Sequence, residues 1–88
     1  MKAFHLKISS PEGDIFSGEA EMLSLRTTEG ELAILAGHIP FVSSVVPCKC
    51  KILLPDETEI IASTDGGILT VSSDKTVLLT GSWEREEK

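Results

Sequence analysis

The 88-residue sequence contains no tyrosine, one tryptophan and three phenylalanines, so aliphatic side chains must supply most of any core. A chain of this length forms one domain and buries only about 60 to 65% of its unfolded surface. Basic residues are also few, with 8 Lys and Arg against 14 Asp and Glu, which gives a net charge of −6. Because nucleic-acid binding needs clustered cations, this balance argues against it and favours contact with a basic or neutral protein surface.

Long hydrophobic runs are missing as well. No apolar stretch approaches the roughly 20 residues that a membrane-spanning helix needs. The first residues, Met1 to His5, lack the apolar segment and small-residue cleavage site of a secretory signal. We therefore expect a cytoplasmic protein.

Cysteine is limited to Cys48 and Cys50, which are one residue apart. In a strand the two side chains point to the same face, which suits neither an ordinary disulfide nor a four-ligand zinc site. The two histidines, His5 and His38, add no metal-binding spacing. We expect buried, reduced, structural cysteines, and neither a metal nor a cofactor.

Alternation of polar and apolar residues predicts about nine short strands, with turn residues at intervals of roughly 8 to 12 residues. The expected strands are 4–8, 15–17, 20–28, 32–35, 41–46, 48–54, 58–63, 68–71 and 77–79. The segments 48–54 and 58–63 form a hairpin around Pro55. No segment has the length and period of a helix, so the fold class is an all-β antiparallel sandwich or barrel.

This domain spans residues 1–82 and is followed by a charged tail, 83–88, which could start a helical turn too short to persist alone. Four apolar residues fall on the nominal outer side of the strands: Met22, Leu53, Ile61 and Leu78. Scattered singly they mean nothing, whereas gathered into one patch they indicate a partner surface. The sequence leaves both readings open.

The stretch from Glu29 to Pro40 organises the rest of the chain. It opens with a Glu-Gly turn, continues through 32–35 as a short buried strand, and places His38 in a loop. Catalysis by His38 would need an orienting carboxylate and a reacting group nearby, and no spacing motif supplies them. We expect a loop-structuring or interface histidine. Glu29 and Glu31 flank a glycine, so we expect solvated turn charges or a polar partner contact.

Several stretches, taken in order, resemble a known family. They are 4–8 (FHLKI), 16–19 (FSGE), 29–40 (EGELAILAGHIP), 66–71 (GGILTV) and 77–79 (VLL). Together they cover essentially the whole chain and resemble the epsilon subunits of F-type rotary ATP synthases. The resemblance implies a flattened β-sandwich of about nine to ten strands and a non-catalytic subunit of the central stalk.

In that family the domain sits at the foot of the gamma subunit and touches the polar loops of the membrane rotor ring. It couples ion-driven ring rotation to ATP synthesis at the cytoplasmic face of the membrane, as a peripheral component. Carried over by position, Glu31 would contact the ring, and His38 and Ser43 would lie at the gamma interface. Ser10, in the first turn, would lie near the same end. The resemblance implies no catalytic residue and no cofactor.

The chain also departs from the family pattern. The usual loop, Gly-Ile-Leu-Pro-Gly-His, here has Ala33 and Ala36 in place of the first glycine and the proline, and Ala36 loses the fixed φ of proline. The family commonly adds a C-terminal helical hairpin that inhibits ATP hydrolysis and in some members binds ATP. Because the sequence stops at Lys88, neither property is expected here.

Two other functions remain open at this point. One is a free-standing β-sandwich protein-binding module of the same fold outside the synthase. A distant third possibility is a small hydrolase that uses His38 and a cysteine. The sequence does not distinguish proton from sodium coupling.

Overall fold

The computed structural model describes residues 2–86, and this part of the chain contains ten strands and no helix. The strands are β1 (Phe4–Ser10), β2 (Gly13–Ala20), β3 (Met22–Thr27), β4 (Gly30–Ile34), β5 (Phe41–Val45), β6 (Cys48–Leu53), β7 (Glu59–Thr64), β8 (Gly67–Val71), β9 (Lys75–Thr80) and β10 (Trp83–Arg85). The all-β prediction is confirmed, as is the hairpin of β6 and β7. The described residues form no helix long and apolar enough to cross a membrane.

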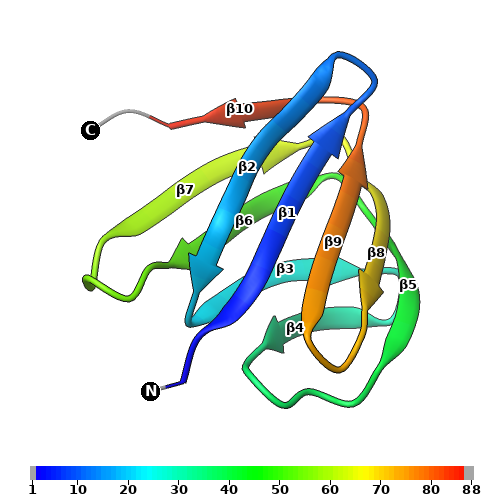
Figure 1. Cartoon of the computed structure of the whole chain (residues 1–88). Coiled ribbons are helices and arrows are strands. Elements are labelled where there is room, and N and C mark those ends of the chain that lie inside the picture. Colours follow the sequence, from blue (N-terminus) through cyan, green and yellow to red (C-terminus); the bar gives the residue numbers. More distant parts are fainter. Residues whose placement is uncertain (1, 87–88) are drawn as a thin grey trace.

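The strands form one sheet that folds over on itself. Its order is β10-β7-β6-β3-β5-β8-β9-β1-β2, and β4 pairs with β3 off this path. Figure 1 shows β1, β2 and β9 crossing in front of β3, β6 and β7, so the core lies between two layers. Pairing is antiparallel except between β1 and β9, which are parallel. The antiparallel prediction missed this pair because a parallel neighbour can be reached only by a long connection, here most of the chain.

The sheet passes from one layer to the other at β3. The first half of β3, Met22–Ser24, pairs with β6, whereas Thr27 at its end pairs with Val45 of β5. Two further backbone bonds tie β3 to β5: Val46 N–H donates to Arg26 O, and Thr28 N–H donates to Ser44 O, both at 3.1 Å. On its other side β3 carries β4 along its length.

The core is almost entirely aliphatic, as the scarcity of aromatic residues predicts. Its buried members are Leu6, Ile8, Ala20, Leu23, Leu25, Ile34, Val45, Cys50, Ile52, Ile60, Leu69, Val71 and Leu78. The period-2 alternation predicted for 4–8, 20–28 and 48–54 is confirmed, since every second residue of β1, β3 and β6 turns inward.

The register of β9 differs from the prediction. Leu78 was assigned to the outer face, but it is fully buried, and its neighbour Leu79 is 53% exposed. Because residues 77–79 are all apolar, the sequence does not show which of them face the core. Moving the strand by one residue exchanges its inward and outward side chains. The inward positions on either side of Leu78 are threonines, Thr76 and Thr80, both buried.

Two further expectations are wrong. The segment 32–35 is not a buried strand, because only Ile34 is buried and Leu35 is 46% exposed. Since β4 pairs with β3 alone, it lies at an edge. Trp83–Arg85 forms a strand on β7 in place of a helical turn, and Trp83 packs against the core. The last two tail residues, 87–88, lie outside the described residues.

The turn between β7 and β8 depends on two glycines. A Cβ atom on Gly66 would collide with the carbonyl oxygen of Val45, and one on Gly67 with the carbonyl oxygen of Leu79. Gly67 pairs with β5 on one side and β9 on the other. Strands β5 and β9 therefore approach β8 closely at a point where a side chain has no room.

Buried hydroxyls hold this turn to the one that follows β9. The Thr80 hydroxyl donates to Gly66 O at 2.7 Å and lies 2.6 Å from the Thr64 hydroxyl, which accepts from the Gly66 N–H at 3.1 Å. Asp65 Oδ1 accepts from the backbone N–H of Ser82 at 3.1 Å. The two turns are thus fixed to each other just before β10 begins.

We predict that Gly67→Ala lowers the free energy of unfolding by about 3 to 5 kcal/mol, because the new methyl group meets backbone that cannot move aside. Gly13→Ala is the matched control, since Gly13 also has a positive φ, 131°, but has open space around its Cβ position. It should cost only about 1 to 2 kcal/mol. Urea denaturation of both variants measures the difference, and equal losses would contradict the steric argument.

Candidate partner-binding site

A hollow of about 460 Å³ opens between the β3–β4 turn and the start of β5. Its lining comprises Thr27, Glu29, Gly30, Glu31, Leu32, His38, Phe41, Val42 and Ser43. Three of the four residues predicted to bind partners, Glu31, His38 and Ser43, therefore meet in one place. We call this feature the hairpin hollow.

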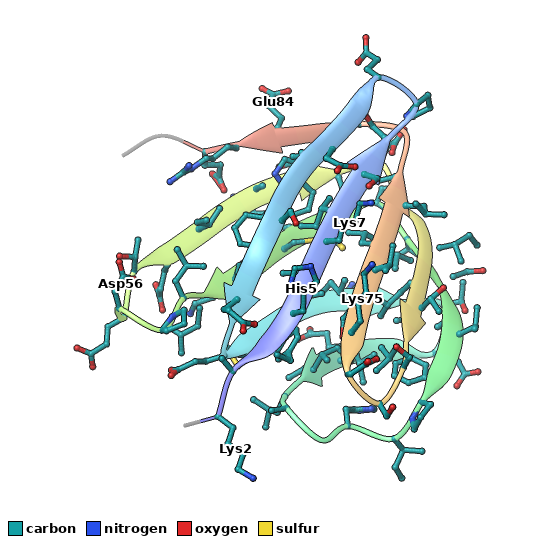
Figure 2. The ribbon with its side chains drawn as sticks, in the orientation of Figure 1. Lys2, His5, Lys7, Asp56, Lys75 and Glu84 are labelled. Atoms are coloured by element: carbon teal, nitrogen blue, oxygen red, sulfur yellow. The ribbon has the colours of Figure 1, made fainter. Side chains whose placement is uncertain are left out.

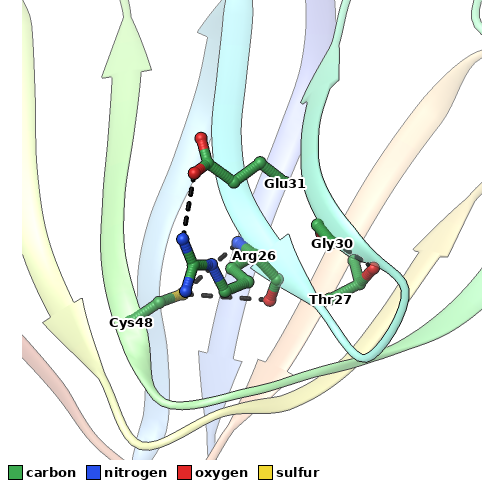
Figure 3. A network of polar contacts seen from close by, with 5 residues as sticks. All are labelled: Arg26, Thr27, Gly30, Glu31 and Cys48. Atoms are coloured by element: carbon green, nitrogen blue, oxygen red, sulfur yellow. Dashed lines mark hydrogen bonds and ion pairs between the residues drawn. The ribbon is translucent and has the colours of Figure 1, made fainter.

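The β3–β4 turn forms one wall of the hairpin hollow. The Thr27 hydroxyl donates to Gly30 O and accepts from the Glu29 N–H, both at 3.1 Å, which closes the turn. Glu31 pairs across the strands with Arg26, and Figure 3 shows their ion pair, with Nη2 and Oε2 3.0 Å apart. Both side chains are more than half exposed, so the ion pair adds little stability and the carboxylate stays available to a partner.

The histidine loop forms the opposite wall. His38 N–H donates to Leu35 O at 3.2 Å, and Gly37 between them has a φ of 83°, typical of a type II turn. The His38 ring packs against Phe41, with centroids 5.0 Å apart. Its Nδ1 lies 2.9 Å from Ile39 O, which places a proton on that nitrogen. The loop thus forms a hydrogen-bonded turn, although Ala36 stands where the resemblance leads us to expect proline.

Ser43 lies on the inner side of β5, as does its cross-strand partner Leu69, which is fully buried. Its hydroxyl reaches only Ser44 O, at 3.5 Å. A partner would therefore contact Ser43 through the hairpin hollow and not across the outer face of the sheet.

Ser10 lies apart from the other three predicted residues. It belongs to the β1–β2 turn, where its hydroxyl lies 3.3 Å from Gly13 O and accepts from Glu12 N–H. It lines a second hollow, of about 410 Å³, with Pro11 and with the end of β9. The structure does not bring Ser10 to the hairpin hollow.

An exposed apolar surface was missed by the sequence analysis. Val42 on β5, Ile68 on β8 and Leu79 on β9 are 68, 44 and 53% exposed. They lie on adjoining strands, and Ile68 pairs directly with Leu79. We call these three residues the apolar face. Val42 also lines the hairpin hollow, so the two features are continuous. The sequence feature that could have indicated this surface is a strand with apolar residues on both faces, as in 77–79.

Basic residues lie on the same outer side of β9 and the neighbouring β1 as Leu79. Figure 2 shows His5, Lys7 and Lys75 on the outer side of β1 and β9, and His5 pairs with Lys75 in register.

Three of the outward apolar residues expected from the sequence lie on other strands, β3, β6 and β7. Met22 and Leu53 are cross-strand partners, Ile61 lies on the strand next to Leu53, and all three are half-buried.

Cys48 lines a third hollow, of about 400 Å³, whose lining includes no histidine and which we call the cysteine hollow. Cys50 is buried in the core. Burial raises the pKa of the Cys50 thiol to about 12, and the neighbouring Cys48 adds to this rise. A buried neutral thiol is a poor nucleophile. The structure therefore does not pair His38 with a cysteine, and in residues 2–86 no three His, Cys, Asp or Glu side chains are grouped to hold a metal.

Comparison with known proteins gives consistent matches. The ATP synthase epsilon chain of Priestia megaterium is 36% identical over 88 residues and that of Clostridium novyi 39% identical over 87. These alignments cover 100% and 99% of this chain but only 65% and 66% of the relatives' own length.

Solved structures share the fold at lower identity. A chain of the Euglena gracilis mitochondrial ATP synthase, in a structure of OSCP, F1 and c-ring, superposes with a TM-score of 0.89 at 20% identity, covering 94% of this chain and 53% of that one. A chain from the central stalk and c-ring of the Tetrahymena thermophila enzyme gives 0.78 at 14% identity, covering 93% and 66%. The model of the family described as "ATP synthase, Delta/Epsilon chain, beta-sandwich domain" matches residues 3–86, and the chain belongs to this family.

Proposed function

We propose that this chain is a non-catalytic component of the central stalk of an F-type ATP synthase. It binds the gamma subunit and the polar loops of the rotor ring, and so transmits ion-driven rotation to the catalytic head. Within the assembled enzyme it lies at the cytoplasmic face of the membrane without entering the bilayer. The observation that carries the proposal is the family match over residues 3–86, together with relatives named ATP synthase epsilon chain.

The apolar face is assigned to the gamma subunit. A stable protein interface needs a desolvated apolar centre with polar residues around it, and Val42, Ile68 and Leu79 provide one. Through Val42 this surface continues into the hairpin hollow. We therefore place His38 and Ser43 at the edge of the gamma contact.

Glu31 is assigned to the ring. It stands on the edge strand β4 with its side chain 78% exposed. A contact of this kind is small and surrounded by water, so its charge sets the orientation of the partners more than their affinity. The exposed ion pair with Arg26 leaves the carboxylate free to exchange partners.

We predict that Leu79→Glu abolishes co-purification with the cognate gamma subunit, because it places a charge in the apolar face directly opposite Ile68. A central interface residue typically contributes 2 kcal/mol or more, about 30-fold in affinity. Ser17→Glu, at an exposed position of β2, is the control and should bind normally. If both variants bind as the unmodified chain does, the apolar face is not the gamma contact; if neither the unmodified chain nor the control binds, the protein is better explained as a free-standing module.

Three further variants separate the two partners. Ser43→Arg and His38→Ala should weaken gamma binding, whereas Glu31→Lys should leave it within about threefold and instead reduce coupled ATP synthesis in reconstituted vesicles. Because Ser43 faces inward, thermal unfolding of Ser43→Arg must first show that the domain is intact. Loss of gamma binding in Glu31→Lys, with the fold preserved, would contradict the assignment of Glu31 to the ring.

A further inference from the structure

Three basic residues on the outer side of β1 and β9 have no role in the proposed function so far. Lys75 lies opposite His5 in the parallel ladder of these strands, and Lys7 follows His5 two residues along β1 (Figure 2). We call these three residues the basic cluster. Within residues 2–86, neither His5 nor Lys75 forms an ion pair or a side-chain hydrogen bond.

The basic cluster does not stabilise the fold. Lys7 and Lys75 are about 8 Å apart at the backbone, since neighbouring strands are about 4.8 Å apart and two residues rise about 6.6 Å. Like charges at this separation repel each other weakly. Lys7 contacts Asp14, with Nζ and Oδ1 3.7 Å apart, but the same oxygen also accepts from the Ser9 hydroxyl at 2.8 Å. The ion pair is exposed and contributes little.

The nearest other carboxylates do not compensate Lys75. Glu19 lies opposite His5 on β2, on the side of β1 that faces away from β9. Asp74 precedes Lys75 in the chain, and its Oδ1 accepts from the Ser72 hydroxyl at 3.4 Å within the β8–β9 turn. The ammonium group of Lys75 is therefore exposed and available to a group outside the chain.

The basic cluster lies within reach of a partner that binds the apolar face. β9 presents Lys75, Val77 and Leu79 on its outer side, because every second residue faces outward. Four residues of strand place Lys75 about 13 Å from Leu79. A stable interface buries about 800 Å² on each partner, which corresponds to a disc with a radius of about 16 Å. Lys75 therefore falls at the rim of such an interface.

We infer that the partner bound to the apolar face carries acidic side chains opposite the basic cluster. In the proposed function, on which this inference rests, that partner is the gamma subunit. The chain as a whole has a net charge of −6, so a local group of cations attracts an acidic surface that the rest of the chain repels. Rim charges act on the rate and orientation of docking more than on the strength of the complex. Lys75 thus selects the orientation in which gamma approaches.

An anionic membrane is the other surface that exposed lysines attract. Sequence segments that bind acidic lipids usually contain about four to eight Lys and Arg residues. The basic cluster contains two lysines, in a chain whose net charge is negative. An acidic protein surface fits this arrangement better than a lipid surface does.

The test is the rate at which the full chain binds the purified cognate gamma subunit, measured by biolayer interferometry at low and high salt. Lys75→Glu should slow association about tenfold at about 20 mM salt but only about twofold at about 0.5 M, because salt screens the attraction. Dissociation should change by less than about threefold, whereas loss of a buried contact accelerates it. Lys75→Arg keeps the charge and should bind as the unmodified chain does.

Arg85→Glu is the matched control, because it changes the net charge equally and Arg85 is likewise exposed and without an ion pair in the described residues. Arg85 lies on β10, which pairs with β7 in the other layer (Figure 1). Its substitution should leave association within about twofold. Thermal unfolding of both variants should match that of the unmodified chain, since neither side chain has a partner within residues 2–86.

Three results would count against this assignment. Unchanged association of Lys75→Glu, or equal slowing in Arg85→Glu, would overturn the role of the basic cluster while leaving gamma binding intact. Sedimentation with vesicles that contain anionic lipid, lost in Lys75→Glu, would assign the cluster to the membrane surface instead. If the unmodified chain does not bind gamma at either salt concentration, the proposed function itself fails, and the acidic contact with it.

Discussion

The branching of β3 is the constraint on which the rest of the structure depends. Within residues 2–86 it is the one strand that pairs with three others, namely β4, β5 and β6. A branch interrupts the regular ladder, and the freed backbone groups need partners. Val46 N–H supplies one for Arg26 O, and the side chain of Cys48 accepts from Arg26 N–H, beyond the residues of β3 that pair with the β6 backbone. Residues of the β3–β4 hairpin thereby line two hollows, the hairpin hollow with β5 and the cysteine hollow with β6.

The sequence predicts a strand well wherever one face is apolar and the other polar. β1, β3 and β6 alternate cleanly, so burial on one side fixes their register. In β9 the pattern fails, because the apolar run 77–79 fits either face and the inward threonines contradict simple hydrophobicity. Thr80 is turned inward by a hydrogen bond to Gly66 O, fourteen residues away. Such a hydrogen bond joins residues far apart in the sequence, so the local alternation of polar and apolar residues does not predict it.

The candidate site likewise combines residues that the sequence indicates with positions that only tertiary contacts determine. The resemblance indicates Glu31, His38 and Ser43, whereas the fold shows that the β3–β4 turn lies beside β5, through the register Thr27↔Val45 and the bond from Thr28 N–H to Ser44 O. The inward orientation of Ser43 and the separate position of Ser10 follow from strand pairing across several strands. The apolar face was missed because its three residues come from three strands. No single stretch of sequence contains more than one of them.

The two surfaces of the proposed interface differ in how firmly the fold holds them. The apolar face stands on β5, β8 and β9, which are joined by continuous ladders and fixed by the approach of Gly67 to Leu79. Glu31 stands on an edge strand, and its exposed pair with Arg26 exchanges for another cation at little energetic cost. A rigid apolar surface suits a partner that stays bound, whereas an adaptable charge suits one that must be met in more than one position. That difference is the physical reason to assign the gamma subunit to the first and the ring loops to the second.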